Sequence, residues 1–205
     1  MVDMGAFRDA VGGWAAGGSG GPASDLAIRL GLRTAVLLEG LSDLAAVEAL
    51  AARRGRDLAA EGVGVVSMGG AMNVGRYAGL LGPPGLGLRL TGLCDERERP
   101  YYERGLKRAG AADGGFFVCA ADLEDEFIRA LGAAAVEDII RVEGDVRAWQ
   151  TFLRQPAQHG RPRQQQLRRF LGTKKGRKIR YGRLLVESLG PGQVPAPLEN
   201  LLASL

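Results

Sequence analysis

Four short runs of apolar residues recur along the first part of the chain. They lie at 34–38 (TAVLL), 63–68 (VGVVSM), 88–94 (LRLTGLC) and 115–119 (GFFVC). Each run is continuous and bounded by glycine, which is typical of strands buried on both faces. Helical spacing fills the intervals, at 71–81, at 100–109 and in a stripe formed by Leu44, Val47, Leu50 and Ala51. Strands alternating with helices predict an α/β fold, with a four-stranded, mainly parallel sheet flanked by helices.

The two ends of the chain follow other patterns. Residues 1–25 are rich in Gly, Ala and Ser, so we expect a flexible arm with at most a short helix near Phe7 to Trp14. An α/β domain is predicted over 26–132 and a basic helical C-terminal extension over 133–205. Helical patterns in that extension and just before it lie at 122–132, 135–153, 164–171 and 177–189, followed by a proline-led short helix in VPAPLENLLASL.

Charge is distributed unevenly, although the formal net charge is only +4. Eleven of the 27 basic residues lie between Arg154 and Arg183 with no acid among them, so the rest has 16 basic against 23 acidic residues. This asymmetry favours a polyanion-binding segment beside a carboxylate site, and a solvated charged face is the alternative. If about five of these cations contact phosphates, affinity for duplex DNA falls with salt at a log–log slope of roughly −4 to −5.

The lengths of the apolar stretches, the N-terminal pattern and the two cysteines indicate in which cellular compartment the protein is expected. No stretch reaches the roughly 18 consecutive apolar residues of a membrane helix, and the N-terminus lacks the pattern of a signal peptide. Cys94 and Cys119 end two apolar runs, which favours buried free thiols in a reducing compartment. We therefore expect a cytoplasmic protein with no membrane association.

Carboxylates follow three of the four predicted strands. Glu39 and Asp43 follow the first strand, Asp95 and Glu98 the third, and the fourth is followed by Asp122, Glu124, Asp125 and Glu126. Parallel strands end at one edge of the sheet, where such a cluster repels itself unless Mg²⁺ or Mn²⁺ neutralises it. Taken singly, Asp43 is also explained as a helix cap and residues 122–126 as a solvated first turn.

A pair of glycines opens onto the same edge. In VVSMGGAMNVGRYAGLL the second strand runs into Gly69 and Gly70, then Asn73 and a helix. Paired glycines let backbone N–H groups approach a phosphate at a helix N-terminus. The segment matches neither G-x-G-x-x-G nor a P-loop, and an ordinary strand-to-helix turn explains it equally well.

Together these segments resemble a known domain. LLEGLSDLAAVEALAARRG resembles the first motif of the Toprim domain of topoisomerases, DnaG-type primases, RecR proteins and OLD (overcoming lysogenization defect) nucleases. GVVSMGGAMNVGRYAGLLG with LRLTGLCDERE is most similar to the OLD-family version, and the resemblance covers residues 33–132. A weaker likeness extends to GRKIRYGRLLVESL and VPAPLENLL. The resemblance implies a Toprim, Rossmann-like catalytic domain over 26–132.

The resemblance also implies roles for individual residues. The catalytic residues would be Glu39 and Lys178, and the metal ligands Glu39, Asp43, Asp95, Glu98 and Glu124. The second acid of the family's D-x-D motif falls on Arg97, so either Glu96 or Glu98 would have to replace it. Nucleic acid would be bound by Gly69, Gly70, Asn73, Arg168, Arg169, Lys174, Lys175, Arg177 and Arg180.

Three functions are compatible with this resemblance. The first is an endonuclease-type phosphodiesterase that uses Mg²⁺ or Mn²⁺, with two ions, and prefers DNA to RNA. The second is a RecR-like, non-catalytic module that binds nucleic acid or a partner, which Arg97 favours. The third is a Toprim-type RNA-processing ribonuclease. The sequence has no Walker motif, so we expect a free-standing Toprim protein or a remnant of a larger system, with a separate ATPase partner or a homo-oligomer.

Overall fold

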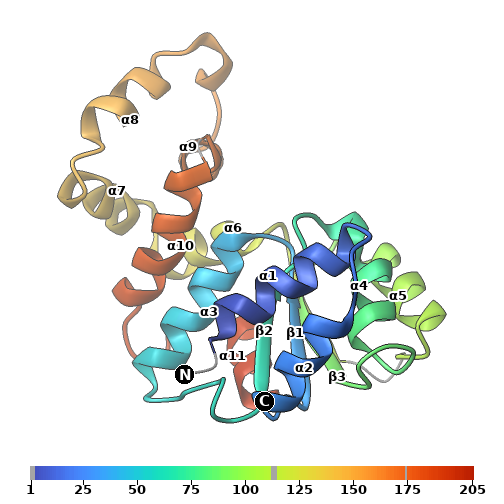
Figure 1. Cartoon of the computed structure of the whole chain (residues 1–205). Helices are drawn as coiled ribbons and strands as arrows, with labels where there is room; N and C mark the ends of the chain where they lie inside the picture. Colours follow the sequence, from blue (N-terminus) through green and yellow to red (C-terminus); the bar gives the residue numbers. More distant parts are fainter. Residues whose placement is uncertain (1–2, 112–114, 174) are drawn as a thin grey trace.

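A parallel sheet of four strands lies at the centre of the protein (Figure 1). The computed structural model describes residues 3–111, 115–173 and 175–205. The strands run in the order β2-β1-β3-β4, and each neighbouring pair is parallel. Their bounds are β1 (Thr34–Leu38), β2 (Val63–Ser67), β3 (Arg89–Asp95) and β4 (Phe116–Cys119). The predicted α/β fold with a four-stranded parallel sheet is therefore confirmed.

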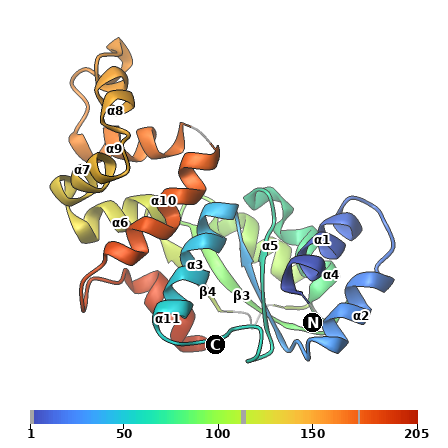
Figure 2. The same cartoon turned by 60° about the vertical axis from the view of Figure 1, so that its left-hand side comes forward.

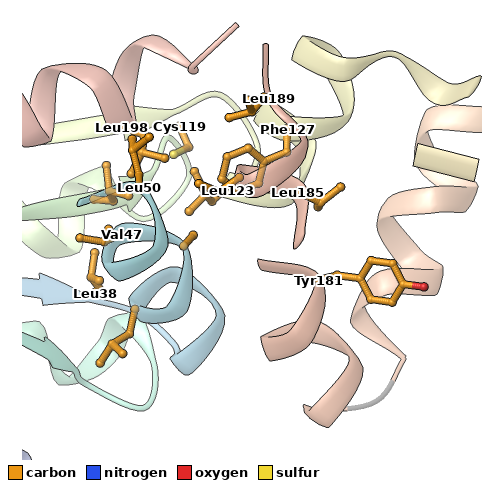
Figure 3. Packing of buried hydrophobic residues seen from close by; sticks show 14 of the residues in the cluster. Leu38, Val47, Leu50, Cys119, Leu123, Phe127, Tyr181, Leu185, Leu189 and Leu198 are labelled. Atoms are coloured by element: carbon orange, nitrogen blue, oxygen red, sulfur yellow. The ribbon is translucent and has the colours of Figure 1, made fainter. Parts of the chain in front are cut away.

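Helices cover both faces of this sheet. On one face lie α3 (Leu41–Arg53), α6 (Leu123–Leu131), α10 (Lys175–Ser188) and α11 (Ala196–Ser204). On the other lie α1 (Met4–Ala15), α2 (Gly21–Arg29), the short η1 (Ala71–Asn73), α4 (Val74–Leu81) and α5 (Arg99–Arg108). Because side chains alternate along a strand, β1 sends Leu38 into the first core and Leu37 into the second. Figure 3 shows the first core, where Val47 and Leu50 lie close to Leu38.

The N-terminal residues differ from the flexible arm that the sequence predicted. Residues 4–29 contain α1 and α2, and Phe7 and Val11 are completely buried against the sheet. Gly64 of β2 makes room for this contact, because a Cβ there would lie 3.1 Å from the Phe7 ring. Because glycine and alanine are so frequent there, the i, i+4 spacing of Phe7 and Val11 gave a weak helical signal in the sequence. Burial of each of these side chains contributes roughly 2 kcal/mol to the stability of the fold.

Only part of the C-terminal extension projects from the body. The projecting helices are α7 (Ala133–Val142), α8 (Val146–Leu153) and α9 (Arg163–Gly172), with η2 (Pro156–Gln158) between the last two (Figure 2). The single helix expected over 135–153 is broken at Gly144, which has a φ of 73°. By contrast, α10 and α11 belong to the core around the sheet, where Leu185 and Leu198 are completely buried (Figure 3).

Two further features follow from the described residues. Cys94 and Cys119 are both buried and free, as the sequence predicted. No helix in the described ranges is long and apolar enough to cross a membrane.

Candidate active site

Three carboxylates meet at the edge of the sheet where β1 and β3 end. Glu39 follows β1, Asp95 is the last residue of β3, and Glu98 lies in the turn that leads into α5. One carboxylate oxygen from each lies within 4.8 Å of the other two. Since the two strands are parallel neighbours, their carboxyl ends necessarily deliver these side chains to the same place.

The turn after β3 decides which acid joins Glu39 and Asp95. The backbone N–H of Glu98 donates to the carbonyl oxygen of Asp95 at 2.9 Å, so the chain reverses within four residues. Residues three apart in such a turn lie close together, whereas Glu96 and Arg97 point to solvent and are exposed. The structure thus brings Glu98, and not Glu96, to the position left open by Arg97.

A second group of charged side chains lines the same small cavity, which has a volume of about 150 Å³. Asp43 comes from α3, Asp122 and Glu124 from the start of α6, and Lys178 from α10. Glu124 is buried, with 4% of its surface exposed, and its Oε1 lies 3.4 Å from Lys178 Nζ. Lys178 therefore places one positive charge among the carboxylates.

Two of these acids also cap helices. The Gly40 N–H donates to Asp43 Oδ2 at 2.9 Å, so the predicted capping role of Asp43 coexists with its place in the cavity. Asp122 caps α6, because its Oδ1 accepts from the Asp125 N–H at 2.8 Å. Its Oδ2 lies 2.6 Å from the guanidinium of Arg168. The sequence analysis counted Asp122 among the acids of this edge but did not include it among the metal ligands.

Burial and mutual repulsion raise the pKa values of these acids. Burial, followed by repulsion from Asp122, Glu39 and Glu98, raises the pKa of Asp95 to about 8. Burial raises the pKa of Glu124 to about 7, against the lowering effect of Lys178. Burial lowers the pKa of Lys178, but Glu124 and Asp43 more than offset this and raise it above its ordinary value. Lys178 is therefore protonated at neutral pH.

The donor set fits a hard divalent cation. Glu98 Oε2 is buried and has no hydrogen-bond partner among the described residues. Burial also raises the pKa of the Glu39 carboxyl, with further contributions from Glu98. Carboxylate oxygens that repel one another are the ligands that Mg²⁺ and Mn²⁺ prefer. Cys94 also lines the cavity, and burial raises the pKa of its thiol to about 12, so without metal it is a neutral thiol.

The paired glycines have a structural role at this edge of the sheet, and their predicted contact with phosphate stays a prediction. Gly69 and Gly70 have φ angles of 70° and 135°, which favour glycine. The Gly70 N–H donates to the carbonyl oxygen of Glu39 at 3.0 Å, and the Asn73 side-chain amide donates to Met68 O at 2.9 Å. These donors hold the β2 turn against the end of β1, and they thereby position Glu39.

Much of the basic segment pairs with acids of the protein itself. Arg177 lies 3.6 Å from Asp145 and stacks on Phe170, with its guanidinium carbon 4.1 Å from the ring centroid. Arg180 also pairs with Asp145, and Arg168 pairs with Asp122. Arg168, Arg177 and Arg180 therefore tie helices together, and their predicted contacts with nucleic acid stay a prediction.

Three further residues of this segment, Arg169, Lys174 and Lys175, were also predicted to contact phosphate. Arg169 is exposed and forms no ion pair with any described residue. Lys174 lies outside the described residues, and the position of the Lys175 side chain is not described.

Comparison with protein families finds a match, which includes Glu39 and Asp95. Residues 32–96 match the profile of the OLD-like Toprim family, described as "Overcoming lysogenization defect protein-like, TOPRIM domain". No curated protein sequence is similar enough to count as a relative.

Solved structures give a second comparison. The C-terminal region of the Burkholderia pseudomallei OLD protein aligns with a TM-score of 0.61 and 23% identity over 84% of this chain and 96% of that one. Two structures of the C-terminal region of the Xanthomonas campestris pv. campestris OLD protein align with a TM-score of 0.59. Their identities are 25% and 26%, over 84% of this chain and 93% of each of those. The first of these likenesses shows the fold, which extends well beyond the residues that match the profile.

Proposed function

Because the chain carries a Toprim domain of the OLD-like family, we propose that it is a metal-dependent nuclease that hydrolyses DNA phosphodiesters. The observation that carries this proposal is the convergence of Glu39, Asp95 and Glu98 within 4.8 Å at the carboxyl edge of the sheet. Three acids from separate positions, with raised pKa values and one unpartnered buried oxygen, have no evident purpose in stabilising the fold.

The carboxylates divide into two neighbouring sets. Glu39, Asp95 and Glu98 would hold one cation, and Asp43 and Glu124 lie where they could serve a second. When bound, divalent cations supply Lewis-acid polarisation of the phosphate and lower the pKa of bound water. The cavity is lined by several carboxylates and one lysine, so it is a preorganised site for cations in the absence of substrate.

Lys178 has a separate part in this proposal. Its ammonium group lies 3.4 Å from Glu124, and Lys178 also lines the larger groove beside the acid cavity. A fixed positive charge at this junction would stabilise the extra negative charge that phosphorus gains in the transition state. Glu124, buried beneath it, holds the long side chain in place and keeps it charged.

Incubation of the purified protein with plasmid DNA, linear DNA and structured RNA tests the proposal. Each substrate is combined with Mg²⁺, Mn²⁺ or EDTA, and the Glu39→Gln and Asp95→Asn variants are run beside the wild type. We expect cleavage of DNA with metal, none with EDTA, and at least a hundredfold loss in both variants. If the variants cleave as fast as the wild type, the carboxylate edge is not the active site.

A binding-only function rests on the departure at Arg97. The carboxylate of Glu98, within 4.8 Å of Glu39 and Asp95, supports the nuclease over this alternative. Retained binding of DNA without any metal-dependent cleavage would nevertheless favour this alternative. Cleavage of RNA but not DNA would instead favour a ribonuclease.

A further inference from the structure

A second hollow, with a volume of about 550 Å³, lies directly beside the acid cavity. The two hollows share Glu39 and Lys178, which form the boundary between them. The groove lies between α1, the turn after β1, the turn after β2 and the start of α10. A phosphate at the carboxylates would therefore have this groove as its immediate neighbour.

The walls of the groove differ chemically from the acid cavity. Leu41 and Ile179 provide apolar surface, with Leu41 43% exposed at the rim, and the charged residues Arg8 and Asp9 of α1 line the groove as well. The hydroxyl groups of Ser67 and Tyr77 form no hydrogen bond with any described residue. Apolar walls with a few free hydrogen-bonding groups are typical of sites for small, flat organic groups, and this volume is within their usual range.

We propose that this groove binds the unstacked base and sugar of the nucleotide next to the scissile phosphate, so that the site acts on unpaired DNA. The proposal rests on the nuclease function and adds its substrate class. In a duplex the bases are stacked and paired, so a base can enter a side pocket only after leaving the stack. Single strands, overhangs and frayed ends supply such a base at least cost.

Leu41 is the residue that would contact the base most directly. It is the first residue of α3, immediately after the Glu39–Gly40 turn, and 43% of its surface is exposed at the rim of the groove. Packing a base against its side chain would cover apolar surface that otherwise faces water. Its two-residue separation from Glu39 would keep the base in register with the phosphate.

The test compares Leu41→Ser and Tyr77→Phe with Ile28→Ser. Ile28 is also an exposed aliphatic residue, 75% exposed, but it lies on α2 and does not line the groove. Two substrates of one sequence are used, a single strand and a blunt duplex, each with 2-aminopurine beside the main cleavage position. Fluorescence is recorded in EDTA, so that the strand is bound but not cut, and cleavage is measured with Mg²⁺.

We expect the wild type to cut the single strand at least about tenfold faster than the duplex. Binding should raise 2-aminopurine fluorescence, because the base unstacks. Leu41→Ser should lower single-strand cleavage about tenfold and reduce the fluorescence rise, with a smaller loss for Tyr77→Phe and none for Ile28→Ser. Thermal unfolding of each variant checks that it is folded.

The failures of the two proposals are distinguishable. Metal-dependent cleavage with no fluorescence change, or with equal rates on both substrates, overturns the groove assignment and leaves the nuclease function standing. A fluorescence rise that depends on Leu41 without any cleavage supports the groove and overturns the nuclease. Identical behaviour of Leu41→Ser and Ile28→Ser also defeats the groove assignment.

Discussion

At Glu98 one carboxylate oxygen is buried and has no hydrogen-bond partner within the part of the chain that the structure describes, whereas Glu96, two residues earlier, is exposed. We predict that Glu98→Gln weakens Mn²⁺ binding about tenfold or more and slows cleavage by at least as much. The reason is that an amide replaces a charged oxygen ligand in a preorganised set. Calorimetry with Mn²⁺ measures the first effect and single-turnover cleavage the second.

Glu96→Gln is the matched control for this prediction. Glu96 is exposed, and its backbone N–H donates to the carbonyl oxygen of Cys119 at 2.9 Å. This variant should bind Mn²⁺ and cleave DNA as the wild type does. If Glu96→Gln is the damaging change and Glu98→Gln is not, the D-x-D position has been assigned to the wrong residue.

Asp95 makes the stability of the metal-free protein depend on pH. Its pKa rises from the model-compound value of 3.8 to about 8 in the folded state. Between these values the folded protein holds a proton that the unfolded chain has lost, so stability falls as pH rises from about 4 to about 8 and then levels off. Glu124, with a pKa of about 7, adds to the same slope up to neutral pH.

Thermal unfolding in EDTA across this pH range checks the prediction. Mn²⁺ should flatten the curve, because the cation takes the place of the proton and binds more tightly as the carboxyls ionise. Asp95→Asn should also flatten it in EDTA. A melting temperature that rises steadily from pH 4 to 8 without metal would contradict the raised pKa values.

Lys178 is predicted to act in chemistry more than in binding. Lys178→Ala should lower single-turnover cleavage roughly a hundredfold while changing DNA affinity little, because its charge is directed at the carboxylate edge. Lys107→Ala, an exposed lysine on α5, is the control and should leave both quantities unchanged. Weaker binding with normal cleavage at saturating DNA would instead identify Lys178 as a phosphate-steering residue.

At the level of elements, the close approach of α10 to α3 places Lys178. A Cβ at Gly182 would lie 2.6 Å from the carbonyl oxygen of Ser42, so only glycine permits this packing distance. Gly182 and Lys178 are four residues apart and therefore share one face of α10. The contact between Gly182 and Ser42 thus sets how far Lys178 reaches toward the carboxylates.

Gly182→Ala should push α10 away from α3. We expect a loss of about 1–3 kcal/mol in the free energy of unfolding, and a fall in kcat that exceeds any change in KM. Gly176→Ala is the matched control on the same helix, since a Cβ there meets nothing within 4 Å. It should be neutral or stabilise the protein by up to about 1 kcal/mol. Equal effects of the two substitutions would remove the argument for the Gly182 contact.

At the scale of the whole molecule, internal ion pairs reduce the number of cations in the basic segment 154–183 that are free to bind DNA. Arg154, Arg161 and Arg169 are exposed and pair with no acid in the described ranges. Six other cations of the segment have acid partners, namely Arg163, Arg168, Arg177, Lys178, Arg180 and Arg183.

We therefore expect a salt dependence shallower than the sequence alone predicted. If only Arg154, Arg161 and Arg169 contact phosphates, log K for duplex DNA should fall against log salt with a slope of about −3. Arg169→Ala should make the slope shallower by about one. Arg183→Ala, which removes a cation already paired with Glu187 at 2.7 Å, should leave it unchanged. Filter binding from low to moderate salt measures both, and a flat dependence would exclude the segment from DNA binding.

The sequence by itself determined the α/β fold and the edge of the sheet that carries the acids. Continuous apolar runs are sufficient to identify buried parallel strands, and parallel strands all end on one side. For this reason Glu39 and Asp95 could be predicted as neighbours from their positions directly after strands. The helix Met4–Ala15 was expected only as a short helix near Phe7 to Trp14 in a flexible arm, because glycine and alanine around Phe7 gave little periodic signal and its packing against the sheet is a tertiary feature.

Only the tertiary structure decided which charges meet. The choice of Glu98 over Glu96 depends on one hydrogen bond within a four-residue turn, and composition contains no signal for it. The pairing of Arg168 with Asp122, and of Lys178 with Glu124, joins residues 46 and 54 positions apart in the chain. A count of charges treats every lysine and arginine alike. Burial and the distance to a partner, which exist only after folding, determine which of them remains free to bind a polyanion.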